Sequence, residues 1–313
     1  MKEAMTELCN AHTHLELSDL GQVCPQTPTS FVKWMSKFNW SLLNRKLDHS
    51  RAAVALGIKA LQACGTTHVH DITNSWVSVE PLLHSGLGGC VYLEVLGQQR
   101  ERALARIKEA MRRIMELRRS HADSPMRIGL SLHSPWSCHP DLLRQGADWC
   151  RENKVPLCIH AAESPAETEL LLTGRVRELG WVKTQIGRSL SILPRNAPGL
   201  RPMPYLDALG VLKARPLLVH AVQVNDEEIA TIARERCSVV HCPRSNALLT
   251  CGRMRLEAFL DAGIPVYLGT DSRVSSPDLD IRAEAVAAKK MHAGRVDAGK
   301  IDAMLSPPDP QPW

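Results

Sequence analysis

Two histidines separated by one residue, His12 and His14, stand in the segment Asn-Ala-His-Thr-His near the start of the chain. Alternate residues of a β-strand point to the same side, so this spacing can aim both imidazoles at one point. Later apolar runs end in further metal-binding residue types, at His160, His220, His241 and Asp271. A third histidine and a carboxylate from other strands would complete a site for a divalent metal ion. The residue types therefore predict a metal-dependent hydrolase.

A carboxylate follows the first of these later histidines. His160 opens the segment His-Ala-Ala-Glu, which places Glu163 three residues further on. An acid in this position can lie beside metal-bound water and move a proton during the reaction. The structural alternative is that Glu163 caps a helix or lies on the surface. We expect the catalytic role.

Four other residues at strand ends have both a functional and a structural interpretation. His220 ends Leu-Leu-Val-His, where a lone histidine would normally belong to the core, and we expect it to orient the reacting water. Asp271 follows Leu-Gly-Thr, and the alternative there is the N-cap of the next helix. His133, in Leu-His-Ser-Pro-Trp, is expected to contact substrate. His241 could position Asp271 or bond to the backbone, and the sequence leaves both roles open.

Strand and helix patterns alternate along the chain. Runs rich in Val, Ile and Leu without polar alternation predict buried parallel strands. These runs are Glu7–Asn10, Thr67–Ile72, Cys90–Val95, Arg127–Leu132, Val155–Ile159, Pro216–Val219, Cys237–Val240 and Ile264–Leu268. Helical spacing appears between them, in Ser50–Cys64, Arg100–Ser120, Asp141–Asn153, Asp226–Arg236 and Arg255–Ala262. The alternation predicts βα units and a parallel sheet.

The candidate site is supplied from both the first and the last predicted strand. Polar groups collected at the carboxyl ends of eight strands are typical of a (β/α)8 TIM-type barrel, and a doubly wound sheet would not explain them. Two connections are long, Gly21–Leu47 and Gly174–Pro204. On the carboxyl-end face such connections are candidate lids and specificity loops. We expect one barrel domain over residues 1–305 and a proline-rich, disordered tail over residues 306–313.

Composition excludes several other classes of protein. The net charge of +5 is modest, and aromatic residues make up only 4% of the chain, so we expect no nucleic-acid partner. The basic stretch Arg100–Arg119 has apolar residues at helical spacing, which favours a solvated amphipathic helix over a surface for an acidic partner. The ten cysteines lack C-x-x-C spacing, and no signal peptide or membrane-spanning segment is apparent. We therefore expect a cytoplasmic protein with free thiols and no membrane partner.

Taken together, these motifs resemble the amidohydrolase superfamily. The branch concerned holds cytosine, S-adenosylhomocysteine and aminofutalosine deaminases and the triazine chlorohydrolases. The resemblance rests on six segments spread from residue 9 to about residue 285. They are Asn-Ala-His-Thr-His, Cys-Gly-Thr-Thr-His-Val, His-Ser-Pro-Trp, His-Ala-Ala-Glu, His-Cys-Pro-Arg-Ser-Asn and Gly-Thr-Asp-Ser.

The resemblance implies a (β/α)8 barrel with one catalytic metal ion, bound by His12, His14, His160 and Asp271. It implies Glu163 as proton shuttle, His220 and Asp271 acting on the attacking water, and His133 touching substrate. Binuclear relatives use a carboxylated lysine after the fourth strand, where this chain has His133 and no nearby lysine. One ion is therefore favoured; zinc suits the ligands, with iron or manganese as alternatives. The implied function is hydrolytic deamination of an amino-substituted heterocycle or nucleoside, a small-molecule substrate, with release of ammonia.

One departure from the family leaves alternatives open. Members usually carry a small β-sandwich built from segments outside the barrel, and we expect this chain to lack most of it. A truncated, non-catalytic remnant is therefore one alternative, and association into a homo-oligomer is open. An adenosine-deaminase-type enzyme shares the H-x-H, the H-x-x-E and the final aspartate. Hydrolysis of an amide, cyclic amide or chloro-substituent by the same site is a third alternative.

Overall fold

The structure, a computed structural model, describes residues 7–194 and 197–308. In these residues eight parallel strands form one sheet, and their order in the sheet is their order along the chain. They are β1 (Cys9–Thr13), β2 (His68–Thr73), β3 (Gly88–Val95), β4 (Met126–Leu132), β5 (Leu157–Ala161), β6 (Leu217–His220), β7 (Ser238–His241) and β8 (Val266–Leu268). Of the expected domain and tail, residues 1–6 and 309–313 lie outside the described residues.

The first and last strands lie against each other, so the sheet nearly closes on itself. Just beyond β8 the backbone N–H of Asp271 donates to the carbonyl of His12 at 3.0 Å. Asn10 and Thr270 exchange two hydrogen bonds across the same seam. Gly269 permits this approach, because a Cβ atom there would lie 2.7 Å from the Cβ of His12. The prediction of a (β/α)8 barrel is confirmed.

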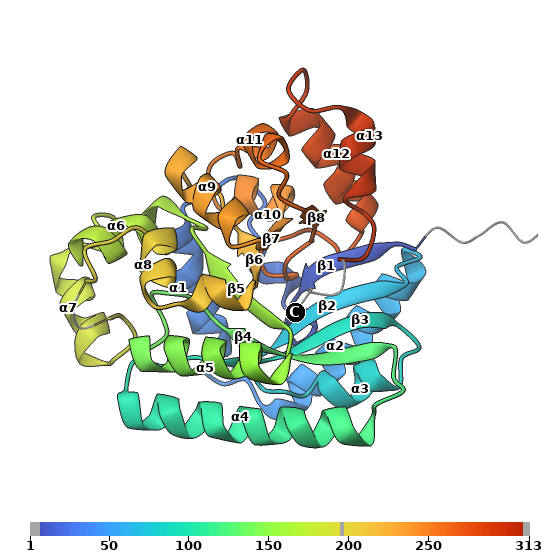
Figure 1. Cartoon of the computed structure of the whole chain (residues 1–313), viewed down its shortest axis with the longest axis horizontal. Coiled ribbons are helices and arrows are strands. Elements are labelled where there is room, and N and C mark those ends of the chain that lie inside the picture. Colours follow the sequence, from blue (N-terminus) through green and yellow to red (C-terminus); the bar gives the residue numbers. More distant parts are fainter. Residues whose placement is uncertain (1–6, 195–196, 309–313) are drawn as a thin grey trace, which may run out of the picture.

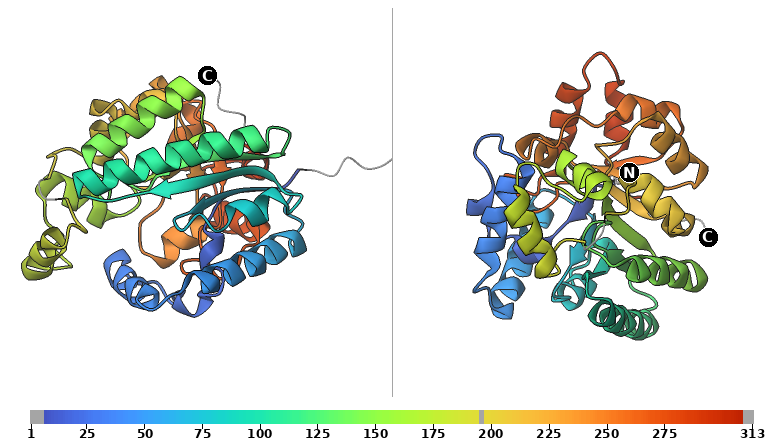
Figure 2. Two further views of the ribbon diagram at one scale, coloured as in Figure 1. Left: turned by 90° about the horizontal axis from the view of Figure 1, so that it is seen from below. Right: turned by 90° about the vertical axis from the view of Figure 1, so that its left-hand side faces the viewer.

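Helices follow the strands and surround the sheet, as Figures 1 and 2 show. The α-helices are α1 (Phe31–Leu42), α2 (Leu47–Ala63), α3 (Val79–Leu83), α4 (Arg100–Ser120), α5 (Pro140–Asn153), α6 (Pro165–Thr173), α7 (Trp181–Ser189), α8 (Pro202–Ala208), α9 (Asp226–Arg234), α10 (Pro243–Leu248), α11 (Leu256–Asp261), α12 (Ile281–Met291) and α13 (Ala298–Ala303). Short 3-10 turns cover η1 (Leu15–Leu17), η2 (Gly21–Val23) and η3 (Val211–Ala214).

Helix α4 shows why the barrel's outer layer forms from this sequence. Its buried residues recur every three or four positions and face the sheet; they are Ala103, Ile107, Ala110, Ile114 and Leu117. Arginines on the other face pair with glutamates of the same helix, as Arg112 does with Glu116. The expected solvated amphipathic helix is confirmed. Neither α4 nor any other helix in the described residues is both long and apolar enough to span a membrane.

The two long connections contain helices of their own. Helix α1 lies in the connection between β1 and β2, and α7 lies in the one between β5 and β6. The indole Nε1 of Trp34 in α1 donates to the carbonyl of Val274 at 2.7 Å, which ties α1 to the segment after β8. Helix α7 stands at the left edge of Figure 1, beside α6 and α8. Side chains from both connections reach the cavity described below.

Candidate active site

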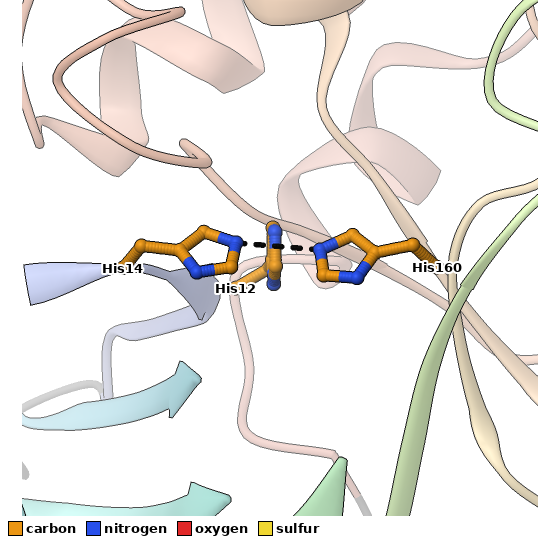
Figure 3. Close-up of side chains that lie close together, drawn as sticks. All are labelled: His12, His14 and His160. Carbon is orange, nitrogen blue, oxygen red and sulfur yellow. Dashed lines mark hydrogen bonds between the residues drawn. The ribbon is translucent and has the colours of Figure 1, made fainter. Parts of the chain in front are cut away.

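Three histidines converge at the carboxyl ends of two strands that are distant in the sequence. His12 lies within β1, His14 directly follows it, and His160 lies within β5. Figure 3 shows His14 and His160 pointing at each other, with His12 between them. The Nε2 atoms of His14 and His160 are 3.3 Å apart, and one ligand atom from each of the three lies within 4.8 Å of the others. The barrel thus joins residues that the sequence separates by 146 positions.

Asp271 supplies a carboxylate to the same point. Its Oδ1 lies 3.5 Å from Nε2 of His12 and 3.8 Å from Nε2 of His14. Its Oδ2 accepts hydrogen bonds from the hydroxyls of Ser245 at 2.8 Å and Ser275 at 2.7 Å. Its Oδ1 accepts the backbone N–H of Ser272 at 2.6 Å. Both carboxylate oxygens are therefore fixed by the protein, and Oδ1 also faces the histidines.

The protonation pattern of these groups fits a metal ion. Nδ1 of His160 lies 3.0 Å from the carbonyl of His133, so Nδ1 carries the proton and Nε2 keeps a lone pair. Burial, followed by the charge of His12, lowers the pKa of His14 to about 3, which keeps that imidazole neutral. Nε2 of His12 is buried without a hydrogen-bond partner among the described residues. Neutral imidazoles with free nitrogens and one carboxylate are suitable ligands for zinc.

Glu163 and His220 lie next to this ligand set. Oε1 of Glu163 is 3.6 Å from Nε2 of His220, and the amide of Asn246 lies 3.1 Å from Nδ1 of His220. One ligand atom of His220 also lies within 4.8 Å of those of His12 and Asp271. Burial, followed by the charge of Asp271, raises the pKa of Glu163 well above its usual range. A protonated carboxyl at this place could act as a general acid.

The turn that carries Glu163 is held by another buried acid, Glu167. Its two carboxylate oxygens accept the backbone N–H groups of Ala162 at 3.1 Å and Glu163 at 2.8 Å. Ala162 has a left-handed φ of 53°, which is unfavourable for a residue with a Cβ. Glu167 therefore fixes an unfavourable turn in the orientation that points Glu163 at the site.

His133 follows β4 and borders the histidine group. Its Nδ1 lies 2.6 Å from the hydroxyl of Ser137, and its carbonyl holds the ring of His160. Burial lowers its pKa to about 4. His133 therefore presents a neutral imidazole beside the ligand set, in the region expected for substrate.

His241 has neither of the two roles that the sequence left open. Its Nε2 faces Nε2 of His292 at 3.2 Å, and its Nδ1 has no hydrogen-bond partner among the described residues. The side chain bonds neither to Asp271 nor to the backbone. Both rings are fully buried, and burial lowers both pKa values. The partner could not be predicted, since His292 lies 51 residues further on, directly after α12.

Five residues of the site were given no role by the sequence. They are Glu94, Glu167, Ser245, Asn246 and Ser275. Ser245 and Asn246 belong to the motif His-Cys-Pro-Arg-Ser-Asn, and Glu94 is an acid in an otherwise apolar strand. These three could therefore have been identified from the sequence. Glu167 lies four residues after its motif and Ser275 three residues after its own, and nothing in the sequence marked either of them.

A cavity of about 850 Å³ opens over the site. Its floor includes His14, His133, His160, Glu163, His220 and Asp271. Its upper wall is largely apolar and comes from the two long connections, with Phe31, Trp34 and Met35 from one and Ile186, Leu190 and Leu193 from the other. The volume is in the range of small-molecule binding sites and would hold a molecule larger than a single heterocyclic base.

The matches to known proteins agree on one family. The family model described as "Amidohydrolase family" matches residues 8–304. Aminodeoxyfutalosine deaminase of Deinococcus radiodurans is 36% identical over 296 residues, which are 91% of this chain and 67% of that protein. The 5′-deoxyadenosine deaminase of Methanothermobacter thermautotrophicus is 28% identical over 285 residues, which are 90% of this chain and 60% of that protein. The chain spans 60–67% of the length of the curated relatives that it matches.

A solved structure shares the fold. An adenosine deaminase from Xanthomonas campestris, crystallised with bound zinc, superposes with a TM-score of 0.76 at 23% sequence identity. The match covers 96% of this chain and 64% of that one. This agreement supports the barrel architecture independently of the sequence motifs.

Proposed function

The chain belongs to the amidohydrolase family, and we propose that it is a metal-dependent deaminase of purine nucleosides. It would replace the exocyclic amine of the purine with oxygen and release ammonia. One observation carries the proposal: His12, His14, His160 and Asp271 meet at one point, with Glu163 and His220 directly beside it. Hydrolysis at an aromatic carbon needs an activated water and a proton donor together, and this arrangement provides for both.

In this proposal His12, His14, His160 and Asp271 hold one zinc ion. When bound, the ion lowers the pKa of a coordinated water from 15.7 toward about 7, which makes a nucleophile available at neutral pH. Oδ1 of Asp271 already lies 3.5 Å from the unpaired Nε2 of His12 and 3.8 Å from Nε2 of His14. Iron or manganese could occupy the same ligands.

The protein's own groups would handle the protons. Asp271 would take a proton from the attacking water at Oδ1, while Nε2 of His220 orients that water. Glu163 would donate its carboxyl proton to a ring nitrogen, which makes the adjacent ring carbon electrophilic. The water oxygen then bonds to that carbon. The proton held by Asp271 passes to the amine, the remaining hydroxyl proton returns Glu163 to its acid form, and the carbon–nitrogen bond breaks to release ammonia. The raised pKa of Glu163 supports its donation to the ring nitrogen.

The names of the relatives and the shape of the cavity support a nucleoside as substrate. By name, the two curated relatives described above are an aminodeoxyfutalosine deaminase and a 5′-deoxyadenosine deaminase. The cavity has a polar floor and a largely apolar upper wall between α1 and α7. A purine could lie on the floor with its amine at the ligand set, while the rest of the nucleoside fills the space above.

Ammonia release from the zinc-loaded chain tests the proposal. Adenosine, 5′-deoxyadenosine, cytosine and a chlorinated triazine form a suitable panel, with chloride measured for the last. We expect ammonia from the nucleosides. Zinc-loaded, folded protein that releases ammonia from none of them would contradict the proposal, and chloride release alone would favour a chlorohydrolase. A chain that retains no metal after purification and reloading would be the non-catalytic remnant.

Glu163→Gln separates chemistry from metal binding. Glutamine keeps the size and polarity of the side chain but cannot exchange a proton at neutral pH. Metal content should stay at the wild-type value while kcat falls by about 10²- to 10⁴-fold, the usual contribution of a general acid–base group. Normal turnover in this variant would remove Glu163 from the mechanism.

A further inference from the structure

Three buried carboxyl groups, Glu16, Asp71 and Glu94, stand together near the ends of β1, β2 and β3. Both oxygens of Glu16 and both of Asp71 accept hydrogen bonds from the protein. The donors are Thr73, Asn74 and Ser75 for Glu16, and Thr13, Leu15 and Ser78 for Asp71. These two acids are therefore internally satisfied, as buried polar groups normally are.

Glu94 differs from both neighbours. Its Oε2 accepts a hydrogen bond from the side-chain amide of Asn74 at 3.3 Å. Its Oε1 is buried and accepts no well-formed hydrogen bond from the described residues; the nearby Ser131 hydroxyl, which lowers the pKa of Glu94, is itself buried without a well-formed hydrogen bond. The residue is only 4% exposed, yet it lines the cavity over the site. Leaving a buried polar oxygen unpaired costs free energy. A molecule that fills the cavity and donates a hydrogen bond to Oε1 would therefore bind more tightly than one that does not.

The position of Glu94 places this free oxygen beside the reaction centre. One ligand atom each of Glu94, His133 and His160 lies within 4.8 Å of the other two. Such a trio could suggest a second metal ion. However, Nδ1 of His160 is bonded to the carbonyl of His133, and its Nε2 faces His14. His160 has no ring nitrogen left for a second ion, which favours a group of a bound molecule over a metal ion as the partner of Glu94.

We propose that Glu94 is a specificity residue that forms a hydrogen bond with a sugar hydroxyl of the substrate, next to His133. The inference rests on the proposed nucleoside substrate. A hydroxyl fits this position because it can both donate and accept. Burial, followed by the charge of Glu16, raises the pKa of Glu94 to about 8, so near neutral pH the carboxyl is also able to do either.

The test compares adenosine with 2′-deoxyadenosine and 3′-deoxyadenosine on the zinc-loaded chain. Glu94→Leu and Glu94→Ala remove the hydrogen-bonding group, and the second covers the case that the first does not fold. In wild type, one deoxy analogue should have a lower kcat/KM than adenosine. In both variants this preference should shrink by about 10- to 100-fold, the size expected for a lost hydrogen bond to a charged or buried acceptor. Glu94→Gln, which can still donate and accept, should keep much of the preference.

Asp71→Asn is the matched control. It removes a carboxyl from the same group of acids, but one whose oxygens are already paired inside the protein. It should lower the melting temperature and leave the ratio between the three nucleosides unchanged. A Glu94→Leu or Glu94→Ala variant that lowers kcat/KM for all three nucleosides equally, or for none, would overturn the inference. So would two zinc ions per wild-type chain and one in the variant, because Glu94 would then be a ligand.

Binding of the product separates this inference from the proposed reaction. Inosine and its 2′- and 3′-deoxy forms can be tested by thermal shift, which needs no turnover. One outcome is that wild type releases no ammonia and is still stabilised by inosine more than the Glu94→Ala variant is. In that case the proposed deamination is wrong, and the hydrogen bond of Glu94 to the sugar is supported. If inosine stabilises both equally, or fails to bind zinc-loaded wild type at all, the Glu94 contact is wrong.

Discussion

Glu167→Gln tests the idea that a buried carboxylate holds the catalytic turn in place. In the structure, each oxygen of Glu167 accepts one backbone N–H, from Ala162 and from Glu163. Glutamine has nearly the same shape but only one oxygen. Its amide NH₂ group would face the second N–H, donor against donor. One of the two backbone groups must therefore lose its partner.

The size of the effect follows from this single loss. A buried N–H left without a partner costs about 1–3 kcal/mol. For a chain of this length that corresponds to a fall in Tm of about 2–5 °C, by scaling the unfolding entropy per residue. The freed turn also carries Glu163. Because the left-handed φ of Ala162 is unfavourable, this turn should change its conformation once the hydrogen bond is lost. A small displacement of a proton donor is costly, so kcat should fall by about 10-fold or more while zinc content is unchanged.

Melting curves, zinc content and ammonia release, measured on the same preparations, check this expectation. Glu169→Gln is a suitable control on the same helix, because Glu169 pairs with the exposed Arg177 and should contribute little to stability. A Glu167→Gln variant with wild-type Tm and kcat would refute the reasoning. A lower Tm with unchanged kcat would show that the turn is needed for folding but not for placing Glu163.

Three further predictions concern the metal, the substrate and pH. Wild type should bind one zinc per chain and His12→Ala should lose it on dialysis; elemental analysis giving two per chain would exclude a mononuclear site. His133→Ala should keep its zinc and lose about 0.5–1.5 kcal/mol in kcat/KM, as for one hydrogen bond, whereas loss of zinc would make His133 a ligand. Burial, followed by the charge of Arg127, lowers the pKa of His70 to about 3, below the unfolded value of 6.5. The stability that depends on neutral His70 is present above pH 6.5 and is lost as pH falls, by about 2 kcal/mol at pH 5. Urea unfolding of the metal-free chain at pH 7 and pH 5 should show this loss, and in His70→Gln the difference between the two pH values should shrink by that amount.

The barrel could be predicted because its strands are apolar runs separated by amphipathic helices, but strand ends at the site were placed too early. The first strand was predicted to end at Asn10, whereas β1 continues to Thr13 and pairs with Asp71 of β2. The fifth was predicted to end at Ile159, whereas β5 includes His160. In the sequence, polar residues at the carboxyl end of a barrel strand look like the start of a loop. In the folded chain their backbone groups still pair with the neighbouring strands.

Contacts within the site were harder to predict than its reactive groups. His12, His14, His160 and Asp271 belong to compact motifs, and a barrel necessarily brings such strand ends together. Ser275 is a different case. Its hydroxyl fixes Oδ2 of Asp271, but a serine in a loop has many uses, and only the folded chain shows this one. The apolar cavity wall from α1 and α7 likewise depends on how two long connections fold over the barrel.

Backbone conformation and unpaired atoms point to the same part of the molecule. Ala162, His220 and Asp271 all have positive φ, at 53°, 77° and 62°. Ala162 directly follows β5, His220 ends β6, and Asp271 lies three residues beyond β8. Such conformations cost about 1–3 kcal/mol each and persist only where surrounding contacts enforce them. The unpaired Nε2 of His12 and Oε1 of Glu94 add to this cost. A ligand that binds only the folded state adds stability that grows with its concentration relative to its Kd, so metal and substrate would offset this strain. Zinc bound at His12 should therefore raise the melting temperature of the chain, and a nucleoside bound at Glu94 should raise it further, by more when the hydroxyl partner is present.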